Sequence, residues 1–171
     1  CPQYFIFTEQ ELLKKGTLAR VNPPLRTETD RLAVLEGVLD GTLDCIVTDH
    51  APHSAEEKAR SLPEAPSGMV GLETSLAACY TALCKTGLLS FPALLRRMTV
   101  NPAGILHLPV ALGPGDPADL AVFDPAEEWV VDPARFRSKG KNSVFTGETL
   151  TGRIQMTICA GRIVYESGDV T

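Results

Sequence analysis

Long apolar runs and dense basic clusters are missing from this sequence of 171 residues. No apolar stretch approaches the roughly 20 residues that a membrane span needs, and no basic-then-apolar signal pattern opens the chain. The densest basic pair is Arg96 with Arg97, in a chain of formal net charge -5, which argues against binding to nucleic acid or to an anionic membrane. These absences predict a cytoplasmic protein whose partner is a small molecule.

Paired cysteines and repeats are missing as well. The five cysteines include no C-x-x-C pair, so neither a disulfide framework nor a structural zinc site is indicated. Cys45, Cys79 and Cys84 lie in apolar segments without an accompanying His or Asp pattern. Packing as small hydrophobic side chains is therefore favoured over a nucleophilic role.

The remaining composition is that of a globular protein with a sizeable core, with 44% hydrophobic and 22% charged residues. The chain opens at "CPQYFIF" without a methionine or any lead-in to its first apolar run. We therefore expect it to be part of a longer polypeptide.

Alternation of helices and short apolar strands is predicted for the first half of the chain. Residues 4–7 and 17–21 are typical of short strands, and the prolines of "NPPLR" predict a stiff loop after Asn22. Thr27 is a helix cap, and helical spacing of apolar residues continues to "DGT" at residues 40–42. The β-branched residues of "DCIVTD" then predict a buried strand that ends at Asp49. This alternation of helices and strands indicates a parallel α/β sheet, in which active-site residues usually lie at the carboxyl ends of the strands.

The second half of the chain changes from helix to strand. Residues 50–71 form a long proline-containing loop of the kind that is usually functional. Residues 72–87, 91–98 and 99–108 predict three helices, the last of which includes His107. Turn residues between short runs of β-formers follow, and "CAG" at residues 159–161 is typical of a hairpin.

The motif D-H-A-P-H at residues 49–53 carries the clearest chemistry. Asp49 could ligate a metal, act as a general base, or cap the following turn. His50 and His53 flank Pro52, so they lack the helical spacing of a metal-binding pair. His107, on an apolar helix face, is interpreted as a packed core histidine.

The segments "NPPLRTETDRLAVLEGVLDGTLDCIVTDHAPHSAEEK" and "APSGMVGLETSL" resemble the C-terminal part of a class I dihydroorotase of the cyclic amidohydrolase superfamily. The likeness continues through "MTVNPAGILHL" and "GDPADLAVFD" and covers nearly the whole chain. It implies a (β/α)8 TIM barrel with a small β-sandwich domain and a binuclear zinc centre. The implied activity is reversible cyclisation of N-carbamoyl-L-aspartate to L-dihydroorotate in pyrimidine biosynthesis.

The resemblance also implies a division of the chain and a set of site residues. Residues 1–111 would be the C-terminal part of the barrel, and residues 112–171 the C-terminal strands of the β-sandwich. Asp49 matches a zinc ligand that is also the catalytic acid and base. The matches to substrate-binding residues are Asn22, His53, Ser67 and Gly68. The family usually has Phe-Gly at the last two positions, so a substrate contact there would come from the backbone.

The family's other metal ligands, among them an H-x-H pair, have no counterpart in this sequence. A TIM barrel takes about 250 residues, so we expect the missing N-terminal half of the barrel to be a partner and the isolated chain to be inactive. Association of this chain with further copies of itself, as a homo-oligomer, is an alternative to that partner. Three further hypotheses stay open: an allantoinase, a dihydropyrimidinase, and a non-catalytic dihydroorotase-like subunit that supports aspartate transcarbamoylase. His53 favours a substrate with a free carboxylate.

Overall fold

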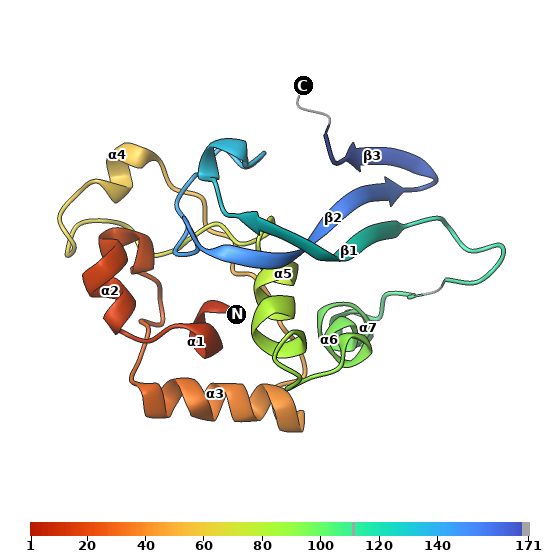
Figure 1. Cartoon of the computed structure of the whole chain (residues 1–171), viewed down its shortest axis with the longest axis horizontal. Helices are drawn as coiled ribbons and strands as arrows, with labels where there is room; N and C mark the ends of the chain where they lie inside the picture. The colour runs from red at the N-terminus through yellow and green to blue at the C-terminus, as the bar shows by residue number, and fades with distance from the viewer. Residues whose placement is uncertain (111, 169–171) are drawn as a thin grey trace.

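The computed structural model describes residues 1–110 and 112–168. Short helices occupy the chain up to residue 105, and an antiparallel sheet follows (Figure 1). The helices are α1 (Gln3–Ile6), α2 (Gln10–Lys15), η1 (Gly16–Ala19), α3 (Glu28–Asp40), α4 (Ala55–Lys58), α5 (Ser75–Cys79), η2 (Tyr80–Cys84), α6 (Phe91–Met98), α7 (Val100–Ile105) and η3 (Pro133–Arg135). The strands are β1 (Leu120–Val130), β2 (Thr149–Cys159) and β3 (Arg162–Glu166). Within the described ranges no helix is both long and apolar enough to cross a membrane.

Helix α3 forms where the sequence predicts it. The Thr27 side chain accepts a hydrogen bond from the backbone N–H of Asp30, and the Asp30 carboxylate accepts one from the backbone N–H of Thr27. This reciprocal capping satisfies two amides that the first turn would leave unpaired. Gly41 ends the helix in the left-handed conformation, with a φ of 90°.

Three segments predicted as strands do not form strands. Residues 4–7 lie mostly in α1, residues 17–21 begin in the 3-10 helix η1, and residues 44–49 have no regular structure. Ile46 is buried, but Val47 is 54% exposed, so the last segment is not covered on both faces. A strand needs a neighbouring strand for its backbone hydrogen bonds. Among the described residues the pairing next to this segment is a single parallel bridge between His50 and Met69. The strand predictions are therefore wrong for this chain.

The predicted helices after the long loop are present, with two differences. Helix α5 continues into the π-helical turn η2, and α7 ends at Ile105. His107 lies beyond that end, exposed, with a φ of 55°. The N–H of Leu108 donates to the carbonyl of Ala103 at 2.8 Å, which closes the helix around this left-handed residue. The prediction of a packed core histidine at His107 is therefore wrong.

The C-terminal strands form one antiparallel sheet in the order β1-β2-β3. The hairpin predicted at residues 159–161 is confirmed, because Ala160 and Gly161 turn the chain with φ values of 46° and 76°. Asp119 steadies this turn by accepting a hydrogen bond from the N–H of Ala160 at 2.7 Å. The division of the chain at residues 111 and 112 stays a prediction. Residue 111 and the end of the second part, residues 169–171, lie outside the described residues.

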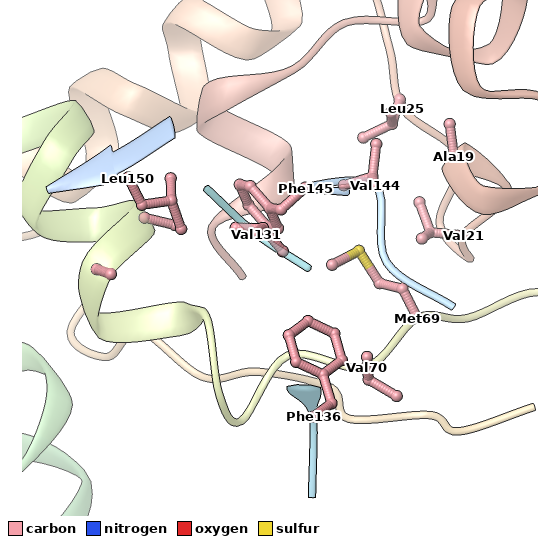
Figure 2. Close-up of a cluster of buried hydrophobic side chains, with 12 residues drawn as sticks. Ala19, Val21, Leu25, Met69, Val70, Val131, Phe136, Val144, Phe145 and Leu150 are labelled. Atoms are coloured by element: carbon pink, nitrogen blue, oxygen red, sulfur yellow. The ribbon is translucent and has the colours of Figure 1, made fainter. Parts of the chain in front are cut away.

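The larger buried cluster joins the N-terminal loops to the C-terminal segments. Figure 2 shows Met69 lying among Val70, Phe136 and Val144. Two members, Val21 and Leu25, flank the "NPP" loop. The members are Ala19, Val21, Leu25, Met69, Val70, Ala77, Ala78, Val131, Phe136, Val144, Phe145 and Leu150. Both loops that carry candidate site residues are therefore anchored in the same core.

A second buried cluster packs the helices together. Its members are Phe5, Val38, Ile46, Cys79, Leu83 and Leu94. Burial raises the pKa of the Cys79 thiol to about 12, so this cysteine stays protonated at neutral pH. The packing role predicted for Cys79 agrees with this environment.

An aromatic junction holds the sheet against the helices. Phe123 on β1 stacks on Phe91 with ring centroids 5.1 Å apart, and its centroid lies 5.3 Å from that of Tyr80. Gly152 on β2 makes the approach possible, because a Cβ added there would lie 2.2 Å from Cζ of Phe123. Gly152 also has a φ of 92°, which side chains rarely tolerate.

We predict that Gly152→Ala destabilises the protein more than Gly161→Ala does. Both glycines have a positive φ, but a Cβ on Gly161 meets open space. Gly161→Ala, the control, should lower the free energy of unfolding by about 1 kcal/mol, from backbone strain alone. Gly152→Ala should lower it by about 1–3 kcal/mol more, because the added methyl overpacks against Phe123. Chemical denaturation of the two variants measures the difference, and equal losses would show that the aromatic junction tolerates the added methyl.

Candidate active site

Asp49 ends the apolar segment of residues 44–49 and is exposed. Its φ of 49° places a non-glycine residue in the left-handed region, where strain is often associated with functional sites. The next residue, His50, pairs with Met69, and the N–H of Ala51 donates to the Met69 carbonyl at 2.8 Å. Within the described part of the chain, the Asp49 carboxylate has no hydrogen bond or ion pair. The carboxylate is therefore accessible to solvent.

The ring of His50 joins two loops. Its Nδ1 accepts hydrogen bonds from the N–H groups of Gly71 at 3.1 Å and Leu72 at 3.4 Å. Its Nε2 lies 3.4 Å from Oγ of Ser138. Since both ring nitrogens have protein partners, His50 supports the arrangement of these loops structurally.

His53 contacts the Ser67 and Gly68 turn directly. Its Nε2 lies 3.1 Å from the carbonyl oxygen of Ser67, so this nitrogen carries the hydrogen and donates it. Its Nδ1 lies 3.7 Å from Oε2 of Glu57. These contacts orient the imidazole, which is only partly buried.

Gly68 is the residue that allows this close approach. Its φ is 130°, and a Cβ added there would lie 2.6 Å from Cβ of Ala51 and 3.2 Å from Nε2 of His53. Only glycine fits both the conformation and the space. The neighbouring Ser67 hydroxyl accepts a hydrogen bond from Nε of Arg20 at 3.3 Å, a contact that the usual phenylalanine of the family could not make.

Asn22 shares a cavity with Ser67. This cavity has a volume of about 420 Å³ and is also lined by Arg20 and Leu62. Asn22 itself is exposed, and the peptide bond between Asn22 and Pro23 is cis. The Pro23 carbonyl accepts a hydrogen bond from the Tyr4 hydroxyl at 2.9 Å.

Asp49 does not line that cavity, but its charge acts on the nearby Tyr4 hydroxyl. Burial raises the pKa of the Tyr4 hydroxyl, and the negative charge of Asp49 raises it further. Tyr4 thus lies within the field of Asp49 while it binds the loop that follows Asn22. The structure therefore brings His53, Ser67 and Gly68 into contact and places Asn22 with Ser67 on one cavity. Asp49 does not line that cavity.

A second cavity, of about 500 Å³, lies between His50 and the sheet. Trp129 and Tyr165 line it together with Arg153. Of the histidines and carboxylates in the D-H-A-P-H motif, His50 alone reaches this cavity. The other residues of the motif do not line it.

The residues that the structure describes contain no group of three or more His, Cys, Asp or Glu side chains that could hold a metal ion. The exposed Asp49 carboxylate suits a zinc ion as one oxygen ligand. A zinc site needs three or four protein ligands, so Asp49 fits the implied metal as a single contributor.

Two buried polar side chains near the site escaped the sequence analysis. Lys58, in the charged run "EEK", resembles a solvated helix end, yet it is 5% exposed. Asn142, in the polar stretch "GKNS", resembles a surface loop, yet it is 4% exposed. No local pattern marks either residue, because their burial comes from segments distant in the chain.

Comparison with known proteins identifies the relatives of this chain. The Amidohydrolase family model matches residues 6–164. The chain is 48% identical over 166 residues to a dihydroorotase of Clostridium acetobutylicum and 49% identical over 166 residues to one of Syntrophus aciditrophicus. Each alignment covers 96% of this chain and 39% of the relative, so the chain spans about two fifths of those proteins.

Solved structures show the same fold. The L-hydantoinase (dihydropyrimidinase) of Arthrobacter aurescens superposes with a TM-score of 0.92 at 32% identity, covering 99% of this chain and 39% of that one. A D-hydantoinase (dihydropyrimidinase) from a Thermus species superposes with a TM-score of 0.84 at 20% identity, over 96% of this chain and 38% of that one. The mixed helix and strand arrangement is thus that of amidohydrolase structures.

We predict that His50→Ala lowers the free energy of unfolding by about 1–3 kcal/mol, because two backbone amides lose their acceptor. His50→Asn should lose less, since its side-chain oxygen can take the place of Nδ1. His107→Ala is the control and should change stability by less than about 0.5 kcal/mol, because that ring is exposed. Denaturant titration of the three variants measures this, and a His50→Ala protein as stable as the control would contradict the supporting role.

Proposed function

Because this chain belongs to the amidohydrolase family, we propose that it is the C-terminal part of a dihydroorotase. Such an enzyme interconverts N-carbamoyl-L-aspartate and L-dihydroorotate by closing or opening a cyclic amide. Support comes from relatives of that name at 47% to 49% identity over almost the whole chain. The observation that carries the proposal is the contact of His53 with Ser67 and Gly68, in a loop that begins at Asp49.

The finer architecture is part of the same proposal. Residues 1–111 would complete a (β/α)8 barrel with strands from the rest of the enzyme, and residues 112–171 would contribute strands to a β-sandwich. Leu13 is 84% exposed and Val47 is 54% exposed in this chain. Such exposed apolar side chains support the proposal that other segments of the barrel cover them in the complete enzyme. Residues 44–49 would form backbone hydrogen bonds with neighbouring strands of the completed barrel.

Asp49 is the proposed acid and base of the reaction. In ring opening, the oxygen of a water molecule bonds to the ring carbonyl carbon, the C–N bond breaks, and the ring nitrogen takes up a proton. The Asp49 carboxylate would accept the proton from the water and deliver it to that nitrogen. Asp49 is exposed, and its carboxylate has no protein partner in the described ranges, so one oxygen would be available for this exchange while the other holds zinc. Zinc held partly by Asp49 would polarise the carbonyl and lower the pKa of the water.

The remaining residues would bind the substrate. The Asn22 amide and the His53 imidazole can both donate hydrogen bonds to a carboxylate. His53 would exchange the hydrogen bond from its Nε2 to the Ser67 carbonyl for one to the substrate. Ser67 and Gly68 would contact the substrate through the backbone, since the Ser67 hydroxyl is engaged by Arg20. Both polar backbone groups of Gly68 have protein partners, so a polar contact would come from the backbone of Ser67 and an apolar one from Gly68. Fixed loops lose little entropy on binding, which favours tight and selective recognition.

We predict that Asp49→Asn and His53→Ala affect different kinetic constants of the complete enzyme. Asp49→Asn should lower kcat by about 10²–10⁴-fold, because proton transfer is lost. His53→Ala should raise KM about tenfold with a smaller change in kcat, because a bond to the substrate carboxylate is lost. Steady-state assays with L-dihydroorotate measure both.

Asp44→Asn and His107→Ala are the matched controls, since each changes an exposed residue of the same type. Near-normal turnover in Asp49→Asn would refute its assignment. Parallel assays test two alternatives: a hydantoin tests the dihydropyrimidinase activity that the name of the L-hydantoinase neighbour suggests, and allantoin tests the allantoinase activity. Turnover of a hydantoin in preference to dihydroorotate would replace the proposed function with that alternative.

We predict that residues 1–171 by themselves bind no pair of zinc ions and show no hydrolase activity. The reason is that Asp49 would be a lone ligand, with no group of three donors near it in the described chain. Metal analysis after dialysis against zinc, together with a dihydroorotate assay, tests this. Two equivalents of retained zinc or measurable turnover would contradict it.

A further inference from the structure

Lys58 is a buried cation whose hydrogen bonds all go to backbone carbonyls. Its Nζ donates to the carbonyls of Pro66 at 3.0 Å, Gly68 at 3.1 Å and Arg20 at 3.4 Å. Within the described residues no carboxylate forms an ion pair with it. Burial lowers the pKa of this amine, and the charge of Arg20 lowers it further. Burial of a cation is costly, and these three hydrogen bonds offset part of that cost.

Both polar atoms of the Asn142 side chain form hydrogen bonds with the backbone of the candidate site. Its Oδ1 accepts a hydrogen bond from the backbone N–H of His53 at 3.0 Å. Its Nδ2 donates to the carbonyls of Ala51 at 3.0 Å and Gly68 at 3.1 Å. One side chain therefore joins the segment of the D-H-A-P-H motif to the turn at Gly68.

The two side chains converge on one atom, the carbonyl oxygen of Gly68. The N–H of Gly68 is engaged as well, because it donates to the Arg20 carbonyl at 2.9 Å. Arg20 precedes Asn22 by two residues, and its carbonyl also accepts from Lys58. Each segment that carries a proposed substrate-binding residue is thus tied to Lys58 or Asn142.

We propose that Lys58 and Asn142 are positioning residues, which set the distances between Asn22, His53 and the Ser67 and Gly68 turn so that these can bind a carboxylate-bearing substrate. This inference rests on the proposed function for the identity of the substrate. Neither residue touches the substrate. Their loss would let the two loops move independently, so that binding of the substrate suffers more than the chemical step.

Four variants of the complete enzyme test this role. Lys58→Met keeps the length and apolar stem of the side chain but removes its donors, and Asn142→Asp removes both donated bonds while keeping the acceptor for His53. Lys139→Met and Asn101→Asp are the controls: Lys139 is exposed, and Asn101 donates to the carbonyl of Asp44, away from the turn at Gly68. The first two variants should raise KM for dihydroorotate at least tenfold with kcat within threefold of the unchanged enzyme. The controls should alter neither constant.

Amide hydrogen exchange supplies a readout that does not depend on activity. In the unchanged enzyme without ligand, the amides of Gly68 and His53 should be protected. In Lys58→Met and Asn142→Asp the Gly68 amide should exchange at least tenfold faster, because the hydrogen bonds that hold its turn are lost. The amides between β1 and β2 should not change. Absence of turnover by the unchanged enzyme would refute the proposed function, while the exchange comparison would still decide the positioning role.

Three results would overturn the inference: unprotected Gly68 and His53 amides in the unchanged enzyme, unaltered exchange in both variants, or equal effects in the variants and their controls. A loss of kcat without a change in KM would also overturn it, because the residues would then act on the chemical step. The first result needs no variant, so it applies even where Lys58→Met fails to fold.

Discussion

The hydrogen bonds to the carbonyl of Gly68 are the constraint on which the candidate site depends. A buried ammonium and a buried amide meet at this oxygen, and both would carry a desolvation cost without it. Gly68 accepts them in a conformation that only glycine adopts readily, close against Ala51. The same turn places the Ser67 carbonyl on His53. The orientation of the imidazole therefore follows from the satisfaction of buried polar groups.

The core fixes where this turn lies. Met69 and Val70, which directly follow Gly68, are 1% and 3% exposed and belong to the larger buried cluster. Val21 belongs to it on the other side, directly before Asn22. Since protein interiors are densely packed, neither segment can shift without opening a cavity. The site is thus a set of loops whose ends are held rigidly, as binding loops on a scaffold usually are.

Asp49 and His53 differ in their environments, and this suits different tasks. The carboxylate of Asp49 is exposed and has no protein partner in the described chain, whereas both ring nitrogens of His53 lie near protein acceptors. A group that exchanges protons with water needs access, and a group that recognises a substrate needs a fixed direction.

By itself the sequence determined the helix that begins after Thr27, the hairpin at residues 159–161 and the residues that resemble a dihydroorotase site, because capping, turn chemistry and motifs are local. It could not determine whether residues 44–49 pair as a strand, since that depends on neighbours elsewhere in the fold. Nor could it identify Lys58 and Asn142, because the residues next to them in the sequence are charged or polar and indicate an exposed segment. Only the tertiary structure buried them, because the carbonyls that they satisfy come from segments far apart in the chain.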